Sequence, residues 1–332
     1  MTGLATERGF HAIPTAMHAS ASTWLRALLS VPTLLLRHDD ARLVDVLTHI
    51  AAGIDAFTAM LVKDLPKLVD PSEFYEVYRP LLNGFHQHPL GVILRLDLLN
   101  RPEVHDVKLE ARGPSAGQST LFLLLDLALG LKHAPHSNTS ASSANSAVAG
   151  AGIPCGNSHE EAPPTSRMAS FQREMLAYMP SEHRALALDF AEALHATGYG
   201  SAAGYLDCSP PQSSAATPSK CQSSSGGSGA RSGRPPSTTR LRRAPAPFGP
   251  WASARRTAAR TAYSRCCASL AAMRRAHLSV VSTYLATRGA NKGTGATSYG
   301  KLLSEALANT SAAAADAEST DVEGPAGKPK RE

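Results

Sequence analysis

The sequence predicts an all-helical protein whose folded part is interrupted by two low-complexity insertions. The first observation is a stripe of apolar residues at helical spacing between Leu43 and Leu61. The second is the run TLFLLLDLALGLKH from Thr120, which is apolar on nearly every side and indicates a helix buried on all faces. The third is the composition of residues 134–167 and 201–257, where small and polar residues predominate without periodicity, so that no packed core is expected from them.

The first part of the chain predicts two helices. Pro14 and Pro32 bracket a helix centred on residues 19–29. Asp39 or Asp40 is the expected N-cap of the amphipathic helix that follows.

Later segments contain both helices and breaks. Pro80 interrupts a simple helix, and residues 84–114 are rich in Gly and Pro and are predicted as loop. After the first insertion Ser181 is the expected N-cap of a short helix. The folded part is expected to span residues 1–310, followed by a disordered tail over 311–332.

A further helix is predicted from residue 259, and it carries a histidine in its apolar stripe. His277 shares one face with residues three and four positions apart, namely Leu270, Met273, Val280, Val281 and Tyr284. A hydrogen-bonded core histidine fits this spacing, and so does a metal ligand, because neutral imidazole is the commonest protein ligand for metals. The spacing alone leaves both readings open.

Two charged residues need a partner or solvent. Asp126 is the one charge in the apolar helix, and a buried carboxylate is costly unless it is paired. We therefore expect a cation from another helix beside it. Arg79, considered alone, reads as a solvated surface arginine.

Length, charge and cysteine content exclude several classes of protein. The 332 residues suggest two domains, or one large domain with insertions. No apolar run reaches the roughly 18 residues of a membrane span, and residues 1–20 show neither a signal-peptide core nor an Arg-rich transit pattern. We therefore expect a cytoplasmic protein without a membrane partner.

The net charge of +6 is modest, and the arginines gathered in residues 231–275 have no interleaved aromatic residues, so nucleic-acid binding is not expected. The five cysteines lack CxxC spacing, which predicts neither a disulfide scaffold nor a zinc site. The adjacent Cys266 and Cys267 are read as small hydrophobic residues that cannot both face one core.

Four blocks, in matching order, resemble the large haem-binding domain of the indoleamine 2,3-dioxygenase family. They are Arg8-Gly9-Phe10; Phe74 with Arg79 five residues later; Ser115-Ala116-Gly117-Gln118-Ser119-Thr120 with Asp126 downstream; and Met175-x-x-Tyr178-Met179-Pro180 combined with Arg274-x-x-His277 and Gly293-Thr294-Gly295-Ala296-Thr297. Each motif is weak alone, and their order along the chain carries the resemblance.

The resemblance implies a b-type haem whose iron takes His277 as its axial ligand. It implies that Arg274 pairs with Asp126, and that Ser115 and Ala116 belong with these residues to the haem side of the site. The implied reaction opens the indole ring of L-tryptophan, or of another indoleamine, with dioxygen to give N-formylkynurenine, the first step of the kynurenine pathway. We expect a monomer.

The resemblance also implies a substrate pocket on the distal side of the haem. Phe10 and Phe74 would stack on the indole, and Arg79 would bind the substrate carboxylate. Thr294 would approach the amino group, while Ser115 and Gly117 would line the distal side. No catalytic side chain is implied, since the oxygen chemistry belongs to the cofactor.

Several positions depart from the family's pattern. Pro14 stands where the family has a small or hydroxyl residue, Pro114 replaces a glycine of the distal loop, and Ala296 replaces a glycine of the later loop. We expect the family's N-terminal small domain to be missing, since Met1 lies a few residues before Phe10, and the distal face to be open. Two alternatives are a haem-binding relative without dioxygenase activity, and a protein that uses its arginine-rich loop at 231–260 on acidic partners.

Overall fold

The computed structural model describes residues 2–84, 92–95, 106–109, 111–131, 167–208, 250–294 and 297–319. In chain order its elements are α1 (Ala5–Leu29), α2 (Val31–Arg37), α3 (Asp40–Ala59), the π-helical η1 (Met60–Asp64), α4 (Leu65–Leu68), α5 (Pro71–Glu73), the π-helical η2 (Phe74–Tyr78), α6 (Arg79–Leu82), strands β1 (Val92–Arg95) and β2 (Asp106–Leu109), the short 3-10 helix η3 (Ala116–Gln118), α7 (Thr120–Leu129), α8 (Arg167–Leu176), α9 (Ser181–Ala196), α10 (Ala202–Asp207), α11 (Pro250–Tyr284), the short 3-10 helix η4 (Ala286–Arg288) and α12 (Tyr299–Ser319). The fold is all-α, as predicted, apart from one small β-hairpin.

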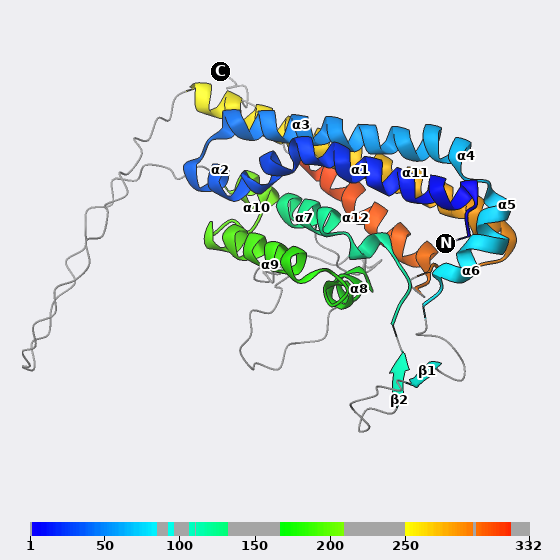
Figure 1. Cartoon of the computed structure of the whole chain (residues 1–332). Helices are drawn as coiled ribbons and strands as arrows, with labels where there is room; N and C mark the ends of the chain where they lie inside the picture. The colour runs from blue at the N-terminus through cyan, green and yellow to red at the C-terminus, as the bar shows by residue number, and fades with distance from the viewer. Residues whose placement is uncertain are drawn as a thin grey trace, which may run out of the picture.

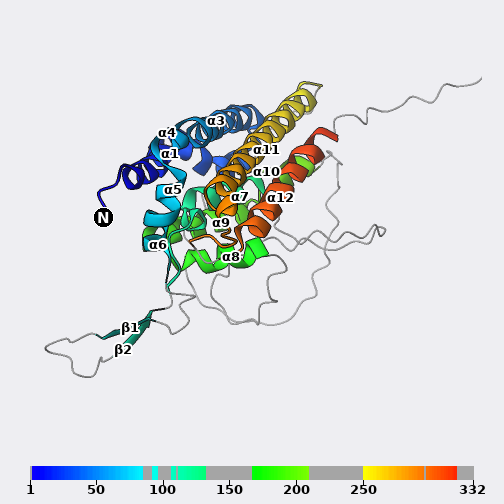
Figure 2. The same ribbon diagram turned by 90° about the vertical axis from the view of Figure 1, so that its right-hand side faces the viewer.

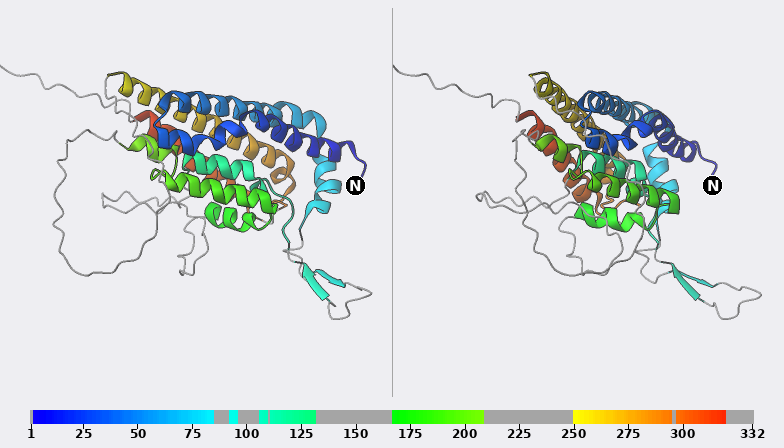
Figure 3. Two further views of the ribbon diagram at one scale, coloured as in Figure 1. Left: turned by 60° about the vertical axis from the view of Figure 1, so that its left-hand side comes forward. Right: turned by 90° about the vertical axis from the view of Figure 1, so that its left-hand side faces the viewer.

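Helix α11 lies at the centre of the arrangement. It packs along α3 on one side and along α12 on the other, and Figure 2 shows α11 and α12 lying side by side. The shorter helices α7, α8 and α9 lie on the side away from α3 (Figure 1, Figure 3). The first turns of α1 lie beside α5 and α6 at one end of the molecule, and α10 lies towards the other end (Figure 1).

The core confirms the predicted stripe of α3. Leu43, Leu47 and Ile50 are buried, and Phe57 packs against Trp24 of α1 with their ring centroids 5.7 Å apart. Asp39 caps the helix by accepting a hydrogen bond from the backbone N–H three residues on.

Two helical stretches, Ala5–Arg37 and Asp40–Leu68, are long and apolar enough to cross a membrane by length and composition alone. A core helix meets the same criterion, and here their apolar faces contribute to the shared core.

Prolines alter the helices less than the sequence suggests. Helix α1 continues through Pro14, contrary to the predicted start beyond it, because the exposed ring faces solvent while Ile13 and Met17 anchor the helix in the core. The expected break at Pro80 is present as the π-helical turn η2 directly before it. A π-turn also precedes Pro66, so a widened turn comes before both prolines.

Several segments predicted to lack structure are folded. The loop predicted over residues 84–114 contains the hairpin, in which Val92 pairs antiparallel with Leu109. Helix α10 lies in the second predicted insertion, yet its Tyr205 and Leu206 are buried in the core. Helix α12 continues beyond residue 310, where the tail was expected to begin.

Three smaller predictions also change. Helix α11 begins at Pro250 rather than at 259. Ser181 is the first helical residue of α9 instead of its cap, and its hydroxyl donates to the Glu182 carboxylate. Cys266 and Cys267 are both buried in the same core, because α11 is covered on two sides. The remaining parts of the predicted insertions and tail lie outside the described residues.

Candidate active site

The apolar face of α11 is buried at both ends and less covered in its middle. Leu270, Met273 and Tyr284 are buried, whereas His277 and Val280 are only partly buried. No hydrogen bond to the His277 imidazole is found within the described residues. Loss of solvation lowers the pKa of this imidazole, which keeps it neutral and able to bind a metal.

The carboxylate of Asp126 has the cationic partner that the sequence predicts. The guanidinium of Arg274, one helical turn before His277, lies 2.5 Å from Asp126 Oδ1. Gln172 of α8 donates to Asp126 Oδ2 at 2.9 Å. Arg274 also donates to the Ala306 carbonyl at 3.1 Å and to the hydroxyl of Thr310. Four helices, α7, α8, α11 and α12, therefore meet at one buried ionic junction.

The loop before α7 is held in one shape by its own hydrogen bonds. The Ser115 hydroxyl accepts from the Gly117 backbone N–H at 3.3 Å, and the Gln118 side chain returns to the Ser115 N–H at 3.3 Å. A Cβ atom at Gly117 would lie 2.2 Å from a ring carbon of Phe171, so only glycine fits this close approach. The predicted distal residues thus form a compact turn against α8.

The two predicted pocket phenylalanines meet. The rings of Phe10, on α1, and Phe74, on η2, have centroids 5.1 Å apart, and Tyr78 packs edge-on against Phe10 at 5.7 Å. Phe74 also contacts Tyr284 of α11 at 5.8 Å, two turns beyond His277. This aromatic cluster, Phe10, Phe74, Tyr78 and Tyr284, connects the N-terminal helix to the helix that carries the histidine.

The π-turn explains the spacing between Phe74 and Arg79. The backbone N–H of Arg79 donates to the Phe74 carbonyl, five residues back, so Arg79 lies one π-helical turn after Phe74. In an α-helix, residues five apart would point in different directions. The wider turn brings the two residues closer in direction around the helix axis.

Arg79 is partly buried rather than freely solvated. Its Nη2 donates to the Lys292 carbonyl at 2.8 Å, and its guanidinium carbon lies 5.5 Å from the centre of the Tyr75 ring. Its Nε is buried and has no hydrogen-bond partner among the residues that the structure describes. An N–H group in this state is available for an acceptor such as a carboxylate.

The loop after α11 joins these parts. The Thr294 hydroxyl donates to the Pro114 carbonyl at 2.5 Å. A Cβ at Gly113 would lie 2.1 Å from the Leu82 carbonyl oxygen and 2.6 Å from that of Thr294. The distal loop, the end of α6 and the loop at 292–294 are therefore in direct contact. Ala296, the predicted departure in this loop, lies outside the described residues.

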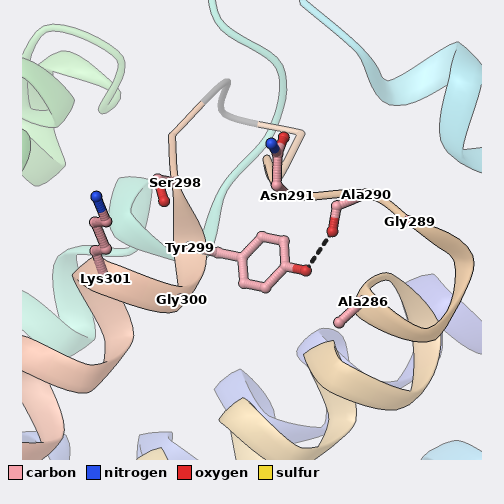
Figure 4. Close-up of a pocket in the computed structure, with 8 residues that line it drawn as sticks. All are labelled: Ala286, Gly289, Ala290, Asn291, Ser298, Tyr299, Gly300 and Lys301. Carbon is pink, nitrogen blue, oxygen red and sulfur yellow. Dashed lines mark hydrogen bonds between the residues drawn. The ribbon is translucent and has the colours of Figure 1, made fainter.

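Two hollows lie near this constellation, and Tyr284 of the aromatic cluster lines the second of them. One, of about 470 Å³, is open and lies between the end of α11 and the start of α12, where Tyr299 reaches across to the Ala290 carbonyl (Figure 4). The other, of about 200 Å³, lies between η1 and α11. Neither is lined by a predicted site residue, and no group of three or more potential metal-ligating side chains is found within the described segments.

Some residues of the site are not found by sequence reasoning. Gln172 and Thr310 complete the ionic junction. Thr310 was not a candidate because it lies directly before the predicted disordered tail. His11 and Tyr78 form a hydrogen-bonded pair beside the aromatic cluster. The only available signal for this pair was its proximity in sequence to Phe10 and Arg79.

The family model described as Indoleamine 2,3-dioxygenase matches residues 1–197. The chain belongs to the indoleamine 2,3-dioxygenase family. Three of the four blocks, and the Met175–Pro180 part of the fourth, fall within the matched residues. The His277 segment lies beyond them, so its assignment depends on its own motif and on the geometry of α11.

Curated relatives of the family match shorter stretches. Indoleamine 2,3-dioxygenase 1 of Rattus norvegicus is 32% identical over 127 residues, covering 38% of this chain and 30% of the relative. Indoleamine 2,3-dioxygenase 1 of Mus musculus is 27% identical over 181 residues, covering 54% and 36%. A 6-hydroxytryptophan 2,3-dioxygenase of Fusarium equiseti is 31% identical over 137 residues, covering 40% and 32%. The chain thus spans about a third of the length of these relatives.

Proposed function

We propose that this chain forms the haem site of a dioxygenase that opens the indole ring of L-tryptophan, or of a related indoleamine, to N-formylkynurenine, the first step of the kynurenine pathway. One observation carries the proposal. Phe10 and Phe74 form an aromatic pair, and Arg79, one π-helical turn after Phe74, has a buried Nε without a partner among the described residues. An indole ring and a carboxylate are the two groups that such a pair and such an arginine recognise.

The residues on α11 fit a haem, on which this family depends. His277 offers a neutral imidazole without a hydrogen-bond partner among the described residues, on an apolar face that is only partly covered. The ion pair of Arg274 with Asp126 holds the preceding turn of the helix in place. Ser115 and Ala116 would lie on the distal side. When bound, the haem would supply the activation of dioxygen for insertion of both oxygen atoms across the indole C2–C3 bond.

The side chains of the proposed pocket bind and orient the substrate. Phe10 and Phe74 pack on the indole, and Arg79 exchanges its bond with the Lys292 carbonyl for a charge-assisted bond to the substrate carboxylate. Thr294 turns from the Pro114 carbonyl towards the substrate amino group. Gly117 and Ser115 restrict the distal side. A cytoplasmic monomer remains part of this proposal.

A haem-binding relative without turnover is the second candidate. It is favoured by the bond between Thr294 and the Pro114 carbonyl, because this bond engages the hydroxyl group that the substrate amine would need. Both candidate functions predict that the chain binds haem, but only the dioxygenase predicts that product is formed. The acidic-partner alternative concerns residues 231–260, most of which lie outside the described residues.

The test is reconstitution of the full chain with haemin, followed by the Soret spectrum and a kynurenine assay from L-tryptophan under reducing conditions. We expect a histidine-ligated spectrum in the wild type and its loss in His277→Ala. The matched control is His195→Ala, an exposed histidine near the end of α9, which should leave the spectrum unchanged.

A spectrum that is indifferent to His277→Ala would contradict the ligand assignment. A normal spectrum without product would favour the inactive relative over the dioxygenase.

A further inference from the structure

Helix α8 contacts both the distal turn and the ionic junction through two neighbouring residues. A Cβ atom at Gly117 would lie 2.2 Å from the Phe171 ring, so this ring presses on the distal turn. The side-chain amide of Gln172, the next residue, donates to Asp126 Oδ2 at 2.9 Å. Helix α8 also packs against α12. One short helix therefore connects the turn before α7 with the residues that surround Arg274.

The two carboxylate oxygens of Asp126 accept hydrogen bonds from different helices. Oδ1 accepts from Arg274 Nη2 at 2.5 Å, and Oδ2 accepts from Gln172. The ion pair is buried, and Gln172 beside it is partly buried. A carboxylate that has lost its water is oriented by the protein donors that it keeps. Gln172 therefore helps to fix the orientation of Asp126, and Asp126 that of Arg274.

We propose that Gln172 is a positioning residue for the helical turn that carries His277. It acts through the ion pair of Asp126 with Arg274. Arg274 and His277 are about one turn apart on α11, so a rotation or shift of that turn moves both side chains together. This inference rests on the proposed function, because it takes His277 as the haem ligand.

A purely structural role for Gln172 predicts a different outcome. If its bond only attaches α8 to α7, its removal destabilises the fold and leaves bound haem in an unchanged environment. A positioning role changes the bond between the iron and the imidazole, because that bond depends on how the ring is oriented by the residues behind it. The stretching frequency of the iron–histidine bond in the reduced haem reports this change, and it does not depend on the fraction of folded protein.

The experiment records the resonance Raman spectrum of the reduced, haemin-reconstituted full chain, and the rate at which the chain loses haem to an excess of apomyoglobin. Gln172→Leu keeps the approximate volume and removes the donor. We expect the iron–histidine band to shift and haem loss to become about three- to tenfold faster, the effect of one hydrogen bond. Gln172→Glu keeps the shape but turns a carboxylate towards Asp126, and it should shift the band further.

The matched control concerns a similar junction on the same helix. Tyr205 donates to Asp40 Oδ1 at 2.6 Å, and Asp40 pairs with Arg256 of α11 at 3.4 Å. Tyr205→Phe thus also removes a neutral donor from a carboxylate that an arginine of α11 holds. Arg256 lies about six helical turns before His277, so this variant should leave the band and the rate of haem loss unchanged.

An unchanged band in both Gln172 variants, even with faster haem loss, would overturn the positioning role and leave the proposed function intact. An equal shift in Tyr205→Phe would do the same, because the effect would then not depend on proximity to His277. If Gln172→Leu folds poorly, Gln172→Glu decides between the two roles. Absence of an iron–histidine band in the wild type would overturn both the positioning role and the proposed function.

Discussion

The proposed haem side and the proposed substrate side of the candidate site are held together by different kinds of contact. On the haem side, the side chains of Arg274 and Asp126 are 10% and 6% exposed, and their partners Gln172, Ala306 and Thr310 come from packed helices. On the substrate side, Arg79 and Thr294 bond to backbone carbonyls of loops. Buried ionic networks resist rearrangement, whereas bonds to loop carbonyls exchange readily for bonds to a ligand. The haem side is thus suited to fix a helix, and the substrate side to respond to what binds.

The largest expected effect is on the haem side. Asp126→Ala leaves the Arg274 guanidinium buried without its counter-charge, and we expect the free energy of unfolding to fall by about 3–5 kcal/mol. Denaturant unfolding of the haem-free chain measures this. The matched control is Asp55→Ala, whose partner Arg265 is 66% exposed, and which should cost at most about 1 kcal/mol. Equal losses in the two variants would mean that the buried junction is no more rigid than a surface pair.

On the substrate side the expected effect is on affinity. Arg79→Ala should weaken binding of L-tryptophan by about 1.5–3 kcal/mol, the contribution of a hydrogen bond to a charged group, with little change in stability. Calorimetric titration of the haemin-reconstituted chain checks the first part, and thermal unfolding checks the second. Arg265→Ala, which removes an exposed arginine of α11 that pairs with Asp55, serves as the control. An affinity that is unchanged in Arg79→Ala removes the carboxylate assignment and leaves the haem site untouched.

The smallest expected effects are on the free energy of unfolding when a threonine is replaced by valine. Thr310 lies on the haem side and Thr294 on the substrate side, so the same substitution can be compared on both. Thr310→Val removes a buried acceptor of Arg274 and should cost about 1–3 kcal/mol of stability, because a charged donor loses a partner. Thr294→Val removes only the bond to the Pro114 carbonyl and should cost about 0.5–1.5 kcal/mol. Denaturant unfolding of both variants provides the comparison. If Thr294→Val proves the more damaging, the substrate side is the more rigid of the two.

Local pattern predicted much of the helical fold. The spacing of apolar residues in α3 and the apolar run of α7 led to helices that the structure contains, because periodicity records which faces are buried. The need for a cation near Asp126 also followed from the sequence, since an isolated buried charge is unfavourable. The resemblance supplied the identity of that cation as Arg274.

Local pattern did less well where packing decides the outcome. Cys266 and Cys267 are both buried because α3 and α12 cover two faces of α11, which no single-helix pattern reveals. Helix α10 has little length or periodicity, and it is folded because Tyr205 fits the core and bonds to Asp40. Helix α12 was missed because its many alanines give little apolar periodicity, although Asn309 and Thr310 are buried against its neighbours.

The sequence by itself determined the helices with strong periodicity, the order of the four blocks and therefore the family. Only the tertiary structure decided that Arg79 follows Phe74 by one π-helical turn, that Thr294 reaches the Pro114 carbonyl, and that His11 bonds to Tyr78. The reason is physical. Periodicity along a chain depends on the backbone of one helix, whereas these contacts depend on how separate helices and loops approach one another.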